Sequence, residues 1–169
     1  MRKKIIVSLL FALVITLFSG CAEKKTASAD ERSLNFGELC INDIVFSVRT
    51  SFDKVKNELG EPVKYQESKS CLYDGFDKTY QYSDITISTY PLEGKEYISS
   101  ITILNETKAI TYNCNVKIGD NMDEVNAKLK EKELITSSTC YQLEETDRGF
   151  AFYFEGDVVS KIEIYSIAE

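Results

Sequence analysis

Two stretches of one pattern decide the predicted fold: Asp120-Asn121-Met122-Asp123-Glu124-Val125-Asn126-Ala127-Lys128-Leu129 and, seventy residues earlier, Thr50-Ser51-Phe52-Asp53-Lys54-Val55-Lys56-Asn57-Glu58-Leu59. Each begins with a capping residue, Thr50 or Asp120, three positions before an aspartate, which resembles a capping box. Apolar residues then recur at i, i+3 and i+7, so each stretch predicts a short helix with one apolar stripe. We expect each helix to pack against a flat apolar surface.

Strands are predicted after both helices, because apolar residues there alternate with polar or aromatic ones. The alternating residues, which we expect to face the helices, are Ile85, Ile87, Ile101, Ile103, Phe150, Phe152, Phe154, Ile162 and Ile164. Residues 97–103 also match residues 158–164. The sequence therefore predicts an α+β fold, a tandem repeat of a capped helix plus antiparallel β-strands, with the helices packed on one face of an antiparallel sheet. Repeat 1 spans residues 39–108 and repeat 2 spans residues 109–169.

The first twenty residues are typical of a secretory signal, since a basic triplet at residues 2–4 precedes a mostly apolar run over residues 5–18. As a helix this run would span about 21 Å, less than a hydrocarbon core of about 30 Å. The stretch Leu17-Phe18-Ser19-Gly20-Cys21 resembles the lipobox of bacterial lipoproteins, although Phe18 stands where that motif usually has Leu. The alternative is a plain signal peptide with an incidental cysteine.

The lipobox resemblance implies that a peptidase removes residues 1–20 and that Cys21 carries a diacylglycerol. Residues 21–38 then form the lipidated cysteine and a flexible tether, because the polar residues that follow Cys21 show no apolar periodicity. Two acyl chains hold a protein stably on a membrane. We therefore expect an exported protein that is lipid-anchored to the cell membrane on its extracytoplasmic face.

Two short patterns carry a further resemblance. Residues 116–119 read V-x-I-G before the second predicted helix, and residues 55–62 read V-x-x-x-L-G-x-P at the end of the first. Together they resemble the superfamily of the beta-lactamase inhibitor protein and of the SmpA/OmlA (BamE) outer-membrane assembly lipoproteins, and the tandem duplication resembles the former. Neither half of the chain carries both patterns. The likeness covers most of residues 39–169, and a shared fold does not imply a shared activity.

Four cysteines besides Cys21 permit two disulfides in an exported protein. Cys71 and Cys140 occupy matching places after the two helices, and Cys40 and Cys114 both precede a helix. We predict the links Cys40–Cys71 and Cys114–Cys140, each stabilising the protein by about 3 to 4 kcal/mol. The beta-lactamase inhibitor family also has one disulfide per repeat, but its cysteines lie after the helix. A Cys₄ metal site is the alternative, and no C-x-x-C spacing supports it.

The strand face opposite the isoleucines is the first candidate site. It is predicted to show tyrosines and small polar groups, namely Thr86, Ser88, Tyr90, Thr102, Ala151, Tyr153, Lys161, Glu163 and Tyr165. Tyrosine offers a large contact area with few rotatable bonds, so Tyr90, Tyr153 and Tyr165 are predicted to bind a partner. The alternative is that these tyrosines reflect β-propensity alone.

The second candidate site is the segment 71–77, which holds two aromatics and two carboxylates around a glycine. Tyr73, Asp74 and Phe76 are its predicted partner-binding residues. In the beta-lactamase inhibitor family a hairpin loop of the first repeat enters the active site of the target, and this segment lies in the corresponding region without matching its sequence. A calcium site at Asp74 and Asp77 would need more oxygen ligands than the segment offers, so a solvated turn is the favoured alternative.

Charge and composition exclude several functions. The net charge is −7 without a run of Lys or Arg, which disfavours binding to nucleic acid. Histidine is absent, which removes the commonest general base and metal ligand, and no G-x-S-x-G or P-loop is present. We predict a non-enzymatic, protein-binding or inhibitor-like module without cofactor or metal. The alternatives are an envelope-assembly component of the SmpA/OmlA type and an enzyme that uses a pair of carboxylates.

Overall fold

The computed structural model describes residues 33–107 and 110–167. The predicted signal peptide, the lipidation of Cys21 and most of the tether fall on residues 1–32 and lie outside the described residues. In chain order the elements are β1 (Glu38–Ile41), β2 (Ile44–Ser47), α1 (Asp53–Leu59), β3 (Lys64–Lys69), β4 (Phe76–Gln81), β5 (Ile85–Leu92), β6 (Lys95–Ile103), β7 (Ile110–Tyr112), α2 (Met122–Lys128), β8 (Leu134–Thr136), β9 (Cys140–Glu145), β10 (Arg148–Glu155) and β11 (Val158–Ser166).

Eight of these strands form one antiparallel sheet in the order β3-β4-β5-β6-β11-β10-β9-β8. β6 and β11 pair in its centre, where Ile101 lies opposite Ile164 and Ile103 lies opposite Ile162. The strand order is therefore mirrored about this central pair. β5 and β6 are joined by Glu93 and Gly94, which both have positive φ (51° and 75°), as a tight two-residue hairpin turn requires.

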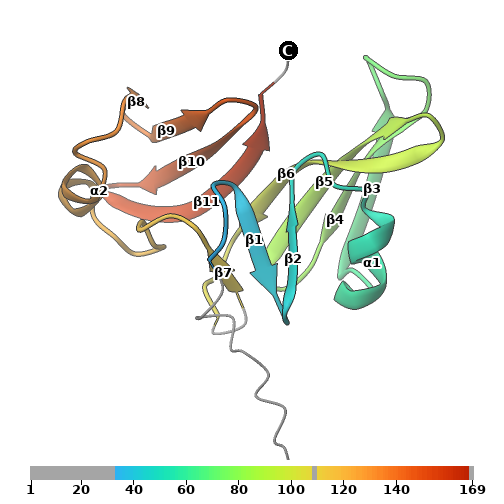
Figure 1. Cartoon of the computed structure of the whole chain (residues 1–169), viewed down its shortest axis with the longest axis horizontal. Coiled ribbons are helices and arrows are strands. Elements are labelled where there is room, and N and C mark those ends of the chain that lie inside the picture. Colours follow the sequence, from blue (N-terminus) through green and yellow to red (C-terminus); the bar gives the residue numbers. More distant parts are fainter. Residues whose placement is uncertain (1–32, 108–109, 168–169) are drawn as a thin grey trace, which may run out of the picture.

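The predicted α+β class is wrong: of the described residues, 51% are in strands and 11% in helices, and the chain does not form a tandem helix-plus-sheet repeat. The physical reason is the size of the helices. Each has seven residues and buries one side chain of its own, Val55 or Val125. Helices this short do not cover a sheet of eight strands, and β1, β2 and β7 form a second, three-stranded sheet that supplies the missing cover. Figure 1 shows α1 and α2 at opposite ends of the long sheet, with β1 and β2 between them.

The predicted alternation of apolar residues is confirmed in the core. All nine isoleucines and phenylalanines of the predicted strands are buried, with Phe154 the most exposed at 8%. Burying side chains of this size contributes about 1.5 to 3 kcal/mol each. The ring of Phe52, just before α1, lies 4.4 Å from that of Tyr80 on β4, and Phe36 packs edge-on against Phe150 at 5.0 Å. The core thus extends beneath both the first helix and the three-stranded sheet.

The predicted helix caps are shifted by one or two positions. α2 is capped by Asn121, not Asp120: the Asn121 side chain accepts a hydrogen bond from the Glu124 backbone at 2.9 Å, and the Glu124 carboxylate accepts one from the Asn121 backbone at 2.8 Å. This is the reciprocal capping box. α1 has no side-chain cap: the residue at its N-cap position is Phe52, and the predicted cap Thr50 lies two residues before it. No helix in the described ranges is long and apolar enough to cross a bilayer.

β1 and β2 form a hairpin near the start of the described chain. Asn42 and Asp43 both have positive φ (48° and 70°) and turn β1 back onto β2. The hairpin is attached to the long sheet by Arg148, whose Nη1 donates to Ser47 Oγ at 3.0 Å, while Ser47 Oγ donates to the carbonyl of Gly37 at 2.6 Å. A Cβ at Gly37 would lie 2.5 Å from the Arg148 side chain, so only glycine fits there.

Candidate functional site

Both helices and the three-stranded sheet share one core with the inward face of the long sheet. The opposite face, here called the open face, carries the side chains that alternate with that core. Strand register places them in rows across the sheet, one of Thr79, Ser88, Ser100 and Tyr165 and another of Thr86, Thr102, Glu163 and Ala151. These side chains are half-exposed apart from Ala151, which is buried. The structure therefore brings the predicted tyrosine-bearing strand face onto one side of the sheet.

The two predicted tyrosines of the β8–β11 half are held by neighbouring carboxylates. The Tyr153 hydroxyl donates to Glu163 at 2.9 Å, and Lys161 Nζ lies 4.0 Å from the centre of the Tyr153 ring. The Tyr165 hydroxyl donates to Glu144 at 2.6 Å. Burial and then the bond to Glu163 raise the pKa of Tyr153 to about 12, and burial and the bond to Glu144 likewise raise the pKa of Tyr165. Both hydroxyls stay protonated at neutral pH and act as donors within the fold.

Tyr165 also lies across a glycine. A Cβ at Gly149, which is opposite Tyr165 on β10, would come within 2.7 Å of the Tyr165 ring and 3.1 Å of the carbonyl oxygen of Leu143. The ring therefore fills the space that a side chain at position 149 would occupy. The Tyr165 hydroxyl is thus bonded to Glu144, and part of the Tyr165 ring packs over Gly149, so both already have contacts within the sheet.

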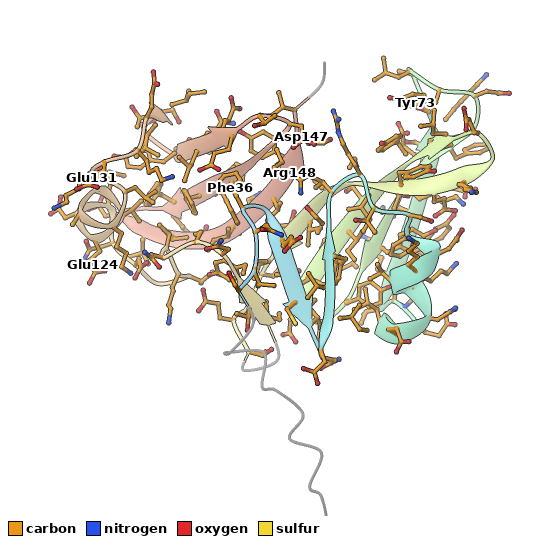
Figure 2. The ribbon with its side chains drawn as sticks, in the orientation of Figure 1. Phe36, Tyr73, Glu124, Glu131, Asp147 and Arg148 are labelled. Atoms are coloured by element: carbon orange, nitrogen blue, oxygen red, sulfur yellow. The ribbon has the colours of Figure 1, made fainter. Side chains whose placement is uncertain are left out.

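The predicted tyrosine of the β3–β6 half is arranged differently. Tyr90 lies between two other tyrosines, with ring centres 5.2 Å from Tyr73 and 5.9 Å from Tyr97 and rings within 28° of parallel. Tyr73 belongs to the β3–β4 loop, residues 70–75, and Figure 2 shows it at the outer end of the molecule. The structure thus joins two sites that the sequence treated separately, the strand face at Tyr90 and the loop at Tyr73.

The β3–β4 loop is held over the sheet by two further contacts. Ser70 is buried, and its Oγ accepts hydrogen bonds from the backbone of Leu72 at 3.4 Å and of Tyr73 at 3.3 Å. Gly75, with φ 131°, lies so close to Pro91 that a Cβ there would be 3.0 Å from that ring. The loop is therefore packed against β5, on the same side as the tyrosine stack.

A groove of about 1140 Å³ lies between this loop and the strands of the β3–β6 half. Its lining residues are Arg49, Gln66, Glu67, Ser68, Ser70, Leu72, Tyr73, Asp77, Lys78, Thr79, Ser88, Thr89, Tyr90, Ser99, Ser166 and Ile167. None of them belongs to β8, β9 or β10. Apart from Ser166 of β11 and the flanking residues Arg49 and Ile167, the lining therefore comes from the β3–β6 half.

Arg49 stands at the rim of the groove. Its Nη2 donates to the carbonyl of Ile167 at 2.9 Å, and its Nη1 lies 3.8 Å from Asp147 Oδ2. Hydrogen bonds from Arg148 hold the pKa of the Asp147 carboxyl below its usual value. Arg49 also has φ 64°, and its backbone donates to Ile98 at 2.7 Å, so this residue links β2, β6 and the end of β11. No motif in the sequence identifies Arg49 as a site residue.

Exposed apolar side chains occur at the outer end of the same half, on the β3–β4 loop and at the adjoining ends of β4 and β5. We call Leu72, Tyr73, Phe76 and Leu92 the apolar tip; their exposed fractions are 85%, 40%, 49% and 39%. The other large exposed apolar residues of the described chain are scattered over separate elements: Val45, Val63, Tyr65, Ile135 and Val158. Of the predicted loop residues, Tyr73 and Phe76 belong to the tip, and Asp74 is exposed beside them.

The four described cysteines are free thiols in the structure, with no pair at disulfide distance. Cys40 is fully buried in β1, and Cys71 is exposed on the β3–β4 loop. Burial raises the pKa of Cys114 to about 12, and burial also raises the pKa of the half-buried Cys140. The links Cys40–Cys71 and Cys114–Cys140 are thus not formed here, and the pairing stays a prediction.

Comparison with protein families, with curated proteins and with solved structures finds no match to this chain. The resemblance to the beta-lactamase inhibitor and SmpA/OmlA superfamily therefore stays a prediction. Within the described ranges no group of three or more Cys, Asp or Glu side chains is arranged to hold a metal ion. The site is characterised by its groove and its apolar tip.

Proposed function

We propose that this protein is an extracytoplasmic, lipid-anchored binding module that holds a partner protein at the apolar tip of its β3–β6 half. One observation carries the proposal: four large apolar side chains of a protein with net charge −7 are exposed at the same end of the sheet, on the β3–β4 loop and at the adjoining ends of β4 and β5. Exposed apolar clusters of this kind mark interaction sites, and aromatic residues are enriched at the centres of interfaces. The lipid anchor at Cys21 rests on the sequence pattern alone.

The tip is preorganised, which favours binding. Tyr73 is stacked on Tyr90, the loop backbone is bonded to Ser70, and Gly75 packs against Pro91. A loop that is already ordered loses little conformational entropy when a partner binds. An envelope-assembly role of the SmpA/OmlA type is compatible with the same surface, because such a role also requires protein partners.

The test is capture of envelope proteins with paired variants of the full-length chain. Phe76→Ser with Leu92→Ser removes two tip residues, and Ile135→Ser with Val158→Ser removes two apolar residues of similar exposure in the other half. Truncating an interface anchor costs about 1 to 4 kcal/mol, so recovery of the partner should fall about tenfold or more for the first pair only. Equal recovery by both pairs would reject the tip as the binding site.

A further inference from the structure

We propose that the groove behind the β3–β4 loop binds an uncharged oligosaccharide. This goes beyond the proposed function, which concerns the apolar tip and a partner protein. The groove and the tip share Leu72 and Tyr73, but Phe76 and Leu92 belong to the tip alone and do not line the groove. A glycan is an extended and flexible ligand, and a groove of about 1140 Å³ slightly exceeds the usual size of sites for small molecules, about 300 to 1,000 Å³.

The chemistry of the lining favours a ligand that is rich in hydroxyl groups. Nine of the sixteen lining residues carry a hydroxyl, seven of them Ser or Thr and two of them Tyr. A hydroxyl donates one hydrogen bond and accepts others, so it pairs with a sugar hydroxyl in either sense. Gln66 adds an amide that likewise donates and accepts. An apolar ligand would leave these groups unpaired, which is costly.

Polar lining side chains are also spaced regularly. Gln66, Thr79 and Ser88 lie in one row on the adjacent strands β3, β4 and β5, and all three line the groove. Neighbouring strands are about 4.8 Å apart, a distance comparable to the length of one sugar ring in a chain. A glycan lying across these strands would therefore meet a new polar side chain with each successive sugar.

The charged and aromatic residues of the lining narrow the class of ligand further. The two lining cations already have partners within the fold, because Arg49 lies against Asp147 and Lys78 is bonded to Glu96, so the groove does not suit an anionic ligand. Tyr73 lines the groove, and one face of its ring is stacked on Tyr90. The ring is 40% exposed, so its other side can contact the apolar face of a sugar. These features make a neutral glycan a better match than an anionic polymer.

The test is calorimetric titration of the full-length chain, in a detergent whose headgroup is not a sugar, with neutral oligosaccharides of about four to six sugars. The probes are β-1,4-linked glucose and N-acetylglucosamine oligomers and α-1,4-linked glucose oligomers, and the monosaccharides serve as the short control. We expect saturable binding of at least one oligomer and none of its monosaccharide. Absence of saturable binding for every oligomer would overturn the proposal.

Two double variants locate the site. Thr79→Val with Ser88→Ala removes two groove hydroxyls at almost unchanged volume and should weaken binding about tenfold or more, since each lost hydrogen bond is worth about 0.5 to 1.5 kcal/mol. Thr86→Ala with Thr102→Val removes two hydroxyls of the same face outside the groove and should change affinity less than about twofold. Equal effects of the two pairs would overturn the site. The tip pair Phe76→Ser with Leu92→Ser should leave glycan binding intact, so failure of the tip and failure of the groove are distinguishable.

Discussion

The two halves of the long sheet have mirrored strand orders, but their open faces differ. In the β3–β6 half a six-residue loop over residues 70–75 is folded onto β5, and it bounds a groove and carries an apolar tip. In the β8–β11 half the corresponding connection has three residues, 137–139, and Ser137 closes it by bonding to Cys140. A loop needs length to leave the sheet and return over it, and the second half lacks that length.

The tyrosines show the same difference. Tyr73 and Tyr90 contact each other and line a groove. By contrast, Tyr153 donates to Glu163 on the adjacent strand β11, and Tyr165 donates to Glu144 on β9, two strands away. A tyrosine that serves as a donor within the sheet has already used the polar group that a partner would need. The comparison teaches that the same residue type on the same face lines a groove in one half and is bonded within the sheet in the other.

The largest expected effect concerns the joint between the halves. Ile101 and Ile164 are fully buried and lie directly opposite each other on β6 and β11. Replacing either by Ala should lower the free energy of unfolding by about 2 to 5 kcal/mol. The loss in the double variant should differ from the sum of the two single losses, because the two side chains lie opposite each other in one core. Urea unfolding followed by two spectroscopic probes should show a single transition. Two separate transitions would show that the halves unfold independently.

A smaller effect is expected at the glycine beneath Tyr165. Gly149→Ala places a Cβ against the Tyr165 ring and the Leu143 carbonyl and should cost about 1 to 3 kcal/mol through overpacking. Tyr165→Ser should relieve part of that cost, so the double variant should be less destabilised than the two single changes added together. Thermal unfolding of all three variants checks this. Strict additivity would show that Tyr165 does not occupy the space over the glycine.

The β3–β6 half should respond to acid through Glu96. This carboxylate accepts hydrogen bonds from Lys78 and from the Tyr80 hydroxyl, and these outweigh the effect of burial, so the pKa of Glu96 is lowered from 4.5. Its contribution to stability is therefore fully present above about pH 4.5 and is lost as the pH falls through the lowered value. Glu96→Gln should cost about 1 kcal/mol at pH 7 and less at pH 3. An equal loss at both pH values would contradict this assignment.

The cysteines at matching places in the two halves should differ in reactivity without affecting stability. Cys71 is exposed on the β3–β4 loop, whereas burial raises the pKa of Cys140. Because the thiolate is the reactive form, iodoacetamide at pH 8 should label Cys71 several times faster than Cys140 in the reduced, folded protein. Peptide mapping over time measures both rates. Faster labelling of Cys140 would place that thiol in a more open environment than the structure shows.

Much of the strand pattern could be predicted from the sequence, because alternation is a local signal: the isoleucines of β5, β6 and β11 are buried as expected. The fold class could not, because it depends on long-range pairing. β7 pairs with β1, which lies about seventy residues earlier in the sequence. The three residues of β7 are too few to show a pattern from which this pairing could be predicted. Each helix has only seven residues, and the three-stranded sheet of β1, β2 and β7 stands where the sequence predicted a layer of helices.

The candidate site was predicted in part for the same reason. Tyr73, Phe76 and Tyr90 were named from composition and local alternation, but the stacking of Tyr73 on Tyr90 beside the groove depends on how the β3–β4 loop folds back. Arg49 lies far from these residues in sequence and has no motif around it. Tyr153 and Tyr165 were assigned to binding because the carboxylates that hold them, Glu163 and Glu144, become their neighbours only through strand register.

The most direct test of the central claim, that partner binding belongs to the β3–β6 half, is site-specific photo-crosslinking in intact cells. A photoreactive amino acid is placed at Leu92 in one strain and at Val158 in another. The two positions are matched: each lies at a hairpin of its own half, and their exposed fractions are 39% and 44%. We predict a discrete crosslinked protein from position 92 and none from position 158. The same product in equal yield from both positions, or a product from position 158 alone, would contradict the account.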